Sequence, residues 1–188
     1  MGTKDRIIFH IDVNSAYLSW EAAYRLQHGD TLDLRTIPSA VGGDATTRHG
    51  IILAKSIPTK PYKIKTGESL YSARLKCPDL VVVPPRYHTY IQCSKALMFM
   101  LEEYSPSIQR FSIDEVFLDY TNMEIHWGDP INAAHRIKDR IKKELGFTVN
   151  IGISSNKLLA KMASDFQKPD KVHTLFPYEI QDKMWPLP

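Results

Sequence analysis

The chain has 188 residues, of which 43% are hydrophobic and 24% charged, so it is long enough for one well-buried core with a small lobe attached. Its net charge of +3 is compatible with nucleic-acid binding but does not require it. The two cysteines stand outside any CxxC motif, and neither a signal peptide nor a run of ~18 apolar residues occurs, which excludes a disulfide framework, a zinc site of usual spacing and a membrane span. We therefore expect a reduced, soluble, cytoplasmic protein without a membrane partner.

The first half of the chain is predicted to alternate between strands and helices. Its expected elements are a buried strand at 6–12, a helix at 14–29, strands at 37–43 and 50–56 joined by a polar turn at 44–49, a helix at 67–77 and a strand at 80–85. Gly29 and Pro78 end the two helices.

The second half continues the same alternation. Its expected elements are a helix at 87–105, strands at 107–113 and 115–121, a helix at 129–146, a strand at 148–154 and a helix at 155–168. In the first of these helices Ile91, Ala96 or Lys95, Leu97 and Leu101 are expected near one side. The Pro-rich tail at 169–188 is expected to end without a finished element.

Strands interleaved with helices, including a central hairpin, indicate an α+β fold with helices covering one face of a mixed β-sheet. The β-α-β-β-α-β order from about Tyr87 onward, combined with the first strand, fits a ferredoxin-like core. The region between about Leu18 and Pro85 would then be a small inserted α/β lobe.

The stretch "FSIDEVFLDY" places two adjacent carboxylates, Asp114 and Glu115, in an otherwise apolar, β-prone run. A hairpin turn there would bring both to one point, and Asp12 ends a strand that we expect beside this hairpin. Three crowded carboxylates are tolerable around Mg²⁺, and two such ions ~4 Å apart can activate a hydroxyl and stabilise a leaving pyrophosphate. The alternative is that Asp114 and Glu115 are exposed turn residues.

Lys157 stands in the first turn of a predicted helix, where the helix dipole disfavours a cation. A bound phosphate would make that position favourable, because free N–H groups and an ammonium together bind anions. The alternative is a solvated lysine.

Three motifs in this order, "FHIDVNSAYLSWEA", "FSIDEVFLDY" and "VNIGISSNKLLAKMASDFQKPD", resemble the Y-family, or lesion-bypass, DNA polymerases of the bacterial polymerase IV and V group. The resemblance runs from about Arg6 to Pro188. It implies that Asp12, Asp114 and Glu115 bind two Mg²⁺ ions, with Mn²⁺ as a substitute and the Val13 carbonyl as an added ligand.

The same resemblance implies roles for residues around the nucleotide. Tyr17 falls at the steric gate, where a ring under the sugar would collide with a 2′-hydroxyl. Ala16 would lie near the nucleotide, Lys157 would bind the triphosphate, and Ser112 matches the family's usual serine before the acids.

The inserted lobe departs from the family pattern. Relatives often carry a Tyr and an Arg that grip the triphosphate. In "AKSIPTKPY", this chain has Ile57 at the position of the Tyr and Lys60 at the position of the Arg. Lysine is a point charge whereas arginine offers a planar fork, so Lys60 is only a weaker equivalent.

The resemblance also implies a domain division. Residues 1–17 and 86–170 would form the catalytic palm, 18–85 the fingers, and 171–188 the truncated start of the thumb. The parts that would follow supply most contacts to duplex DNA, so weak DNA affinity and negligible processive synthesis are expected of this chain alone.

The function that follows is template-directed DNA synthesis past damage, with primer–template DNA and dNTP as partners and a sliding clamp bound through the missing C-terminal region. A nucleotide cyclase is one alternative, although "VGGDATT" gives only GGD, far from the acidic hairpin. The other is an inactive polymerase-like scaffold in DNA repair, which would not need the three acids.

Overall fold

The structure is a computed structural model that describes residues 6–43 and 50–187, and the turn expected at 44–49 lies outside the described residues. The chain divides into two compact units. One, the sheet unit, combines Met1–Asn14 with Ser94–Pro188, and the other, the insert unit, is Ser15–Cys93. Helix α3 (Tyr87–Glu102) begins in the insert unit and ends in the sheet unit.

The sheet unit contains most of the secondary structure. Besides the end of α3, its elements are β1 (Ile8–Val13), β5 (Ile108–Arg110), β6 (Glu115–Asp119), α4 (Glu124–Trp127), α5 (Pro130–Leu145), β7 (Val149–Ser154), α6 (Lys157–Ser164), β8 (Val172–Thr174), η3 (Pro177–Glu179) and α7 (Ile180–Lys183).

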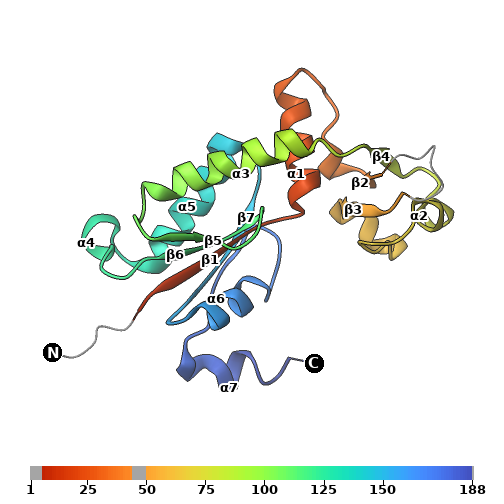
Figure 1. The fold of residues 1–188 in the computed structure, drawn as a ribbon. Helices are drawn as coiled ribbons and strands as arrows, with labels where there is room; N and C mark the ends of the chain where they lie inside the picture. The colour runs from red at the N-terminus through yellow and green to blue at the C-terminus, as the bar shows by residue number, and fades with distance from the viewer. Residues whose placement is uncertain (1–5, 44–49, 188) are drawn as a thin grey trace. The chain divides into compact units, whose positions relative to one another are not determined.

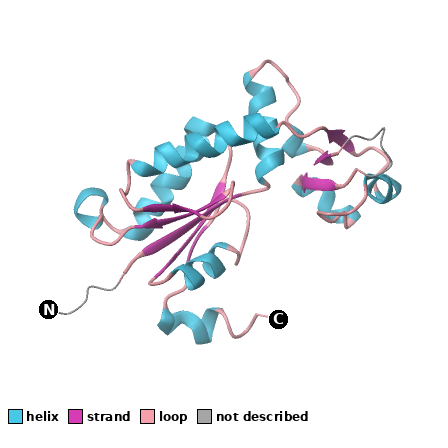
Figure 2. Ribbon diagram, in the orientation of Figure 1, coloured by secondary structure: helices cyan, strands magenta, loops and turns pink. Residues whose placement is uncertain are grey.

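These strands form one mixed sheet in the order β5-β6-β1-β7-β8 (Figures 1 and 2). Strand β1 is antiparallel to both β6 and β7, and β5 and β6 form the expected hairpin. This order and the connections through α3 and α5 confirm the ferredoxin-like class. Strand β8 extends the sheet parallel to β7.

Helices cover both faces of this sheet, which adds a layer to the predicted arrangement. Figure 1 shows α5 and the end of α3 on one face and α6 on the other. Along β1, Phe9 and Ile11 point away from α6, whereas the His10 ring bonds Ser164 of α6. The whole of β1 is therefore buried, charged residue included.

Gly152 lets α6 approach β7 closely. A Cβ at this position would lie 2.0 Å from the Ala160 carbonyl oxygen and 2.5 Å from the Ser164 nitrogen. Both are main-chain atoms, so no side-chain movement could relieve the contact. The second helical layer therefore depends on one missing side chain.

The expected ends of α5 are confirmed. The Asp129 carboxylate accepts a hydrogen bond from the Asn132 N–H at 3.0 Å, and Pro130 occupies the first turn. Gly146 ends the helix with a φ of 77°, the left-handed conformation typical of a C-terminal glycine.

One expectation about packing is wrong, and the tail contains elements that the sequence did not predict. Ile91 is 41% exposed, because the buried side of α3 runs through Ser94, Leu97 and Leu101 instead. The tail contains β8 and α7 before its last residues. It packs Leu175, Ile180 and Met184 against the apolar side of α6.

The insert unit is a small α/β lobe with a sheet of its own in the order β3-β2-β4. Besides the start of α3, its elements are α1 (Ala16–Gln27), η1 (Leu34–Thr36), β2 (Ser39–Gly42), β3 (Ile52–Lys55), η2 (Ile57–Tyr62), α2 (Leu70–Lys76) and β4 (Val81–Val83). One of its apolar clusters packs α2 against β2 and β3 through Ala40, Ile52 and Leu70.

Candidate functional site

The predicted acids come from two neighbouring strands of the sheet unit. In the β1–β6 pairing Asp12 lies opposite Glu115, so their side chains project from the same face. Asp114 precedes β6, and its carbonyl oxygen accepts a hydrogen bond from the Val13 N–H at 3.1 Å. Main-chain pairing thus fixes the backbones of all three acids at one end of the sheet.

Ser112 shapes the turn that carries Asp114 and Glu115. Its hydroxyl donates to the Asp114 carboxylate at 2.7 Å and accepts from the Glu115 N–H at 3.0 Å. The Glu115 carbonyl in turn accepts from the Phe111 and Ser112 N–H groups. A serine here therefore orients the carboxylate and closes the hairpin at once.

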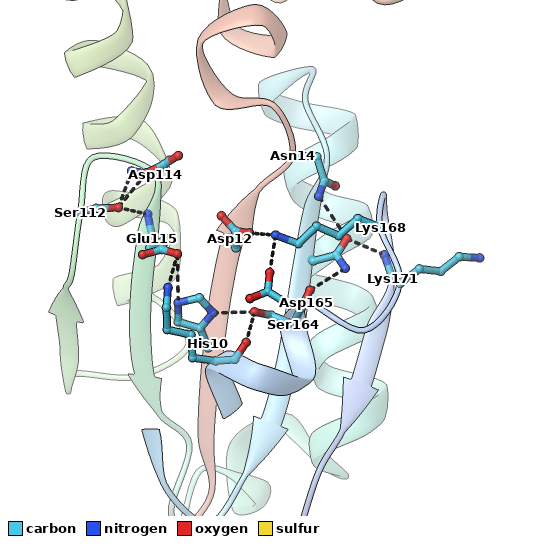
Figure 3. Close-up of polar contacts among 12 residues, drawn as sticks. His10, Asp12, Asn14, Ser112, Asp114, Glu115, Ser164, Asp165, Lys168 and Lys171 are labelled. Atoms are coloured by element: carbon cyan, nitrogen blue, oxygen red, sulfur yellow. Dashed lines mark hydrogen bonds and ion pairs between the residues drawn. The ribbon is translucent and has the colours of Figure 1, made fainter. Parts of the chain in front are cut away.

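Two lysines contact the two facing carboxylates. Lys168 pairs with Asp12 and also with Asp165 at 2.8 Å (Figure 3), and Lys161 of α6 pairs with Glu115. Burial raises the pKa of Asp12, although the Lys168 ammonium opposes this shift. For Lys168 burial acts to lower the pKa, but the bonds to Asp12 and Asp165 outweigh it and the pKa is raised.

His10 lies close to these two ion pairs and is only 1% exposed. Because the Ser164 hydroxyl donates to the Lys161 carbonyl, it accepts from His10 Nδ1–H at 2.8 Å. The Nε2 atom then carries a lone pair, 3.9 Å from the Glu115 carboxylate and without a hydrogen-bond partner among the described residues. Burial and the Lys161 charge lower the pKa of His10 to about 4, so the ring is neutral at pH 7.

Buried amides hold the segment that carries Lys168. The Asn150 amide donates to the Ser164 carbonyl at 2.9 Å and to the Gln167 carbonyl at 2.7 Å. The Asn14 side-chain oxygen accepts from the Asp170 N–H at 2.9 Å. Residues 164–170 are therefore tied to β7 and to the residue that follows β1 by specific bonds.

Lys157 lies elsewhere on the same face. Its ammonium bonds the Gln109 side chain and lies 5.8 Å from the centre of the Phe117 ring. These residues, with Arg6 and Asp119, line a small cavity of about 140 Å³. Among the described residues, the lysines that pair with Asp12 and Glu115 are Lys168 and Lys161, whereas Lys157 bonds Gln109.

The three carboxylates are close in the backbone but are not gathered around one point. Within residues 6–43 and 50–187, no group of three His, Cys, Asp or Glu side chains is arranged to hold a metal ion. Figure 3 shows why, since the Asp114 carboxylate points toward Ser112 and away from that of Glu115. The donors nonetheless fit a hard cation chemically, because two of them already bind an ammonium and all are oxygen ligands.

The remaining predicted residues belong to the insert unit. Ala16 is buried at the start of α1, and the half-buried Tyr17 ring stacks on Tyr90 with centroids 4.8 Å apart. Lys60 is exposed in η2, as is Ile57.

Three residues of the site were missed by sequence reasoning: His10, Lys161 and Lys168. Lys161 stands four residues after Lys157 on α6, a spacing that places both on one helical face. That spacing was the available signal for Lys161. For His10 it was the alternation of β1, which puts residues 10 and 12 on the same face of the sheet.

Residues 11–165 match the impB/mucB/samB family. The chain belongs to this family. Among curated relatives it is 55% identical to a DNA polymerase IV of Clostridium acetobutylicum, over 97% of this chain and 46% of that protein. It is 39% identical to DNA polymerase IV 1 of Bacillus subtilis, over 100% of this chain and 44% of that protein. The chain therefore spans about half the length of these two curated relatives.

Solved structures also match this chain over almost its whole length. A Y-family DNA polymerase chimera of Dbh and Dpo4 matches with a TM-score of 0.83 and 27% identity, over 96% of this chain and 52% of that one. DinB from Sulfolobus solfataricus matches with a TM-score of 0.80 and 27% identity, over 94% of this chain and 50% of that one. The predicted resemblance to the Y-family polymerases is thus confirmed. None of the helices described here has the length and hydropathy of a bilayer span.

Proposed function

We propose that this chain is the nucleotide-binding and catalytic part of a DNA polymerase that copies damaged templates. The observation that carries the proposal is the pairing of Asp12 with Glu115 on adjacent strands, each already opposite a cation. Family membership supports the same function. Residues 1–17 and 86–170 would be the palm and 18–85 the fingers, while 171–188 would lead into the thumb.

Asp12, Asp114, Glu115 and the Val13 carbonyl would hold two Mg²⁺ ions, with Mn²⁺ as a substitute. Bound there, the metal would lower the pKa of an attacking hydroxyl and neutralise phosphate charge. The Asp114 carboxylate would have to leave the Ser112 hydroxyl to join the other two, and Ser112 would keep the hairpin closed through the Glu115 N–H.

The lysines near the acids would bind the triphosphate. Lys168 and Lys161 would be released from Asp12 and Glu115 when these carboxylates bind metal, and their ammonium groups would then be available to phosphate oxygens. Lys157 remains a candidate for the same task through its place at the start of α6. Two lysines thus join the predicted one as candidate phosphate ligands.

Nucleotide selection would belong to the insert unit. The Tyr17 ring would exclude a 2′-hydroxyl, Ala16 would leave room at the nucleotide, and Lys60 would supply charge toward the phosphates. Primer–template DNA and dNTP would be the substrates, and the part absent from this chain would bind a sliding clamp. We place the protein in the cytoplasm.

The test is primer extension by the chain extended with the part of the Clostridium acetobutylicum relative that it does not match. Asp114→Asn should lower kcat/KM by roughly three orders of magnitude, the scale of several kcal/mol of lost charge stabilisation. Asp139→Asn, at a 68% exposed side chain, is the matched control and should leave the rate unchanged. Extension that survives Asp114→Asn would refute the assignment, and cyclic product from one nucleotide without DNA would indicate a cyclase.

A further inference from the structure

The insert unit contains a carboxylate that the proposed chemistry does not use. Glu21 of α1 is 0% exposed, and it accepts from Arg25 Nε at 2.7 Å, from Arg86 Nε at 3.1 Å and from the Tyr90 hydroxyl at 3.1 Å. A buried carboxylate is costly unless donors satisfy it, and here two guanidinium groups and a phenol do so. The cluster fixes the start of α3 against α1.

Tyr90 is the member that contacts Tyr17, the predicted steric gate. Its own ring is fully buried and stacks on Tyr17 at an interplanar angle of 20°. Tyr87 lies edge-on to both rings, with centroids 6.0 Å from Tyr17 and 6.3 Å from Tyr90. Trp20 belongs to the same aromatic group, and its ring centroid lies 6.2 Å from that of Tyr17.

Tyr90 is therefore held at two points on one helix. Tyr17 and Glu21 are four residues apart, so they lie on the same face of α1, one turn from each other. The Tyr90 ring contacts the first and its hydroxyl bonds the second. Such a two-point attachment fixes the tilt of the ring, which a stack alone would leave free to slide.

We propose that Glu21 and Tyr90 are positioning residues for the Tyr17 ring, and that their hydrogen bond sets how strongly a ribonucleotide is excluded. The inference rests on the proposed role of Tyr17 as the ring beneath the sugar. A ring excludes a 2′-hydroxyl only if it cannot move aside. The rigidity of the residues that hold the ring therefore determines how strongly the binding of a ribonucleotide is disfavoured. Glu21 and Tyr90 do not contact the substrate, and they act through Tyr17.

The hydroxyl of Tyr90 remains a donor over the working pH range. Burial raises the pKa of Tyr90 well above its usual value, so the phenol stays protonated. The hydrogen bond from Tyr90 to Glu21 therefore keeps its donor near neutral pH.

Tyr90→Phe removes the hydrogen bond and keeps the stacked ring. We expect it to raise the ratio of ribonucleotide to deoxynucleotide kcat/KM about tenfold, the equivalent of one hydrogen bond to a charged acceptor. Glu21→Gln should shift the same ratio by about threefold, because a neutral acceptor binds the phenol less strongly. Deoxynucleotide kcat/KM should stay within about twofold of the parent in both variants, since the sugar without a 2′-hydroxyl does not press on the ring.

The experiment uses the extended chain in primed-template assays with single ribo- and deoxynucleotides. Tyr71→Phe, at an exposed tyrosine of α2, is the matched control, and Tyr17→Ala is the reference for a removed ring. Urea unfolding confirms that each variant is folded. If Tyr90→Phe fails this check, Glu21→Gln carries the test.

The outcomes separate the two levels of the argument. Discrimination that relaxes in Tyr90→Phe and Glu21→Gln but not in Tyr71→Phe supports the inference. Unchanged discrimination in the folded cluster variants, together with relaxation in Tyr17→Ala, overturns the inference and leaves the proposed function standing. Unchanged discrimination in Tyr17→Ala refutes the role of Tyr17 itself, and the inference falls with it.

Discussion

At the scale of single residues, the feature that stands out is the pairing of each facing acid with a lysine. Asp12 is buried, and its negative charge is offset by Lys168, whose own side chain is 37% exposed. An ammonium and a divalent ion cannot occupy the same side of one carboxylate. Lys168 is therefore a built-in competitor of the metal that Asp12 would bind.

The competition predicts how a Lys168 variant responds to metal. Lys168→Met should lower the free energy of unfolding by about 1 kcal/mol in EDTA, a value discounted for the partial exposure of the pair. Added Mg²⁺ should restore most of this loss, because the cation replaces the missing ammonium. Urea unfolding with and without Mg²⁺ measures both quantities.

The control for this prediction is Lys171→Met. Lys171 is exposed, and it bonds Asn150 through its main-chain N–H, so its side chain should contribute little. Equal losses in the two variants, or a loss in Lys168→Met that Mg²⁺ does not reduce, would contradict the competition.

The residue scale also shows where sequence reasoning stopped. Asp12, Asp114 and Glu115 were found because charge in an apolar strand is conspicuous. Lys161 and Lys168 were missed because lysines on a helix or loop usually face solvent, and only the tertiary structure places an acid beside them. Sequence alone could not predict that the Asp114 carboxylate turns toward Ser112, because a rotamer depends on its neighbours.

At the scale of elements, α6 and the segment after it determine the site. The sequence predicted both α6 and β7, but not that α6 would cover the second face of the sheet. That outcome depends on Gly152, whose missing Cβ makes room for the main chain of another element. Periodicity within one element carries no information about such a pair.

The segment that carries Lys168 is also held by an acid. The Asp170 carboxylate bonds Lys138 and Lys142 of α5, each at 2.9 Å. Burial acts to raise the pKa of Asp170, but the bonds to the two lysines outweigh it and the pKa is lowered. A lowered pKa in the folded state means that the stabilisation is present above the unfolded value of about 3.9 and is lost as pH falls through the folded value.

Asp170→Asn should therefore destabilise the protein by about 1 kcal/mol at pH 7, and this difference should shrink as the pH falls below about 4. Urea unfolding of the parent and the variant at several pH values measures it. Asp139→Asn is the matched control, because Asp139 bonds the same Lys138 from an exposed position. A pH-independent difference for Asp170→Asn would show that its charge is not what stabilises the segment.

At the scale of the whole molecule, the positive charge is unevenly divided between the two units. The insert unit has ten Lys or Arg and six Asp or Glu, whereas the sheet unit has fourteen and fifteen. The net charge of +3 is thus the sum of a net charge of +4 on the insert unit and of −1 on the sheet unit. Average composition predicted only a mildly basic protein, because it cannot show how charge is distributed over a fold.

This division predicts which lysines contribute to DNA binding. The double variant Lys63→Ala/Lys65→Ala, at two exposed positions of the insert unit, should weaken binding to primed duplex and reduce the slope of log affinity against log salt by about 2. With each phosphate contact that is lost, about one counterion fewer is released on binding, so the slope reports the number of contacts.

The comparison is Lys95→Ala/Lys143→Ala, which removes the same charge from exposed positions of the sheet unit and should leave the slope nearly unchanged. Fluorescence anisotropy between 50 and 200 mM salt, about the range over which such contacts weaken, gives both slopes. Equal changes in the two double variants would mean that net charge alone, and not the insert unit, attracts the DNA.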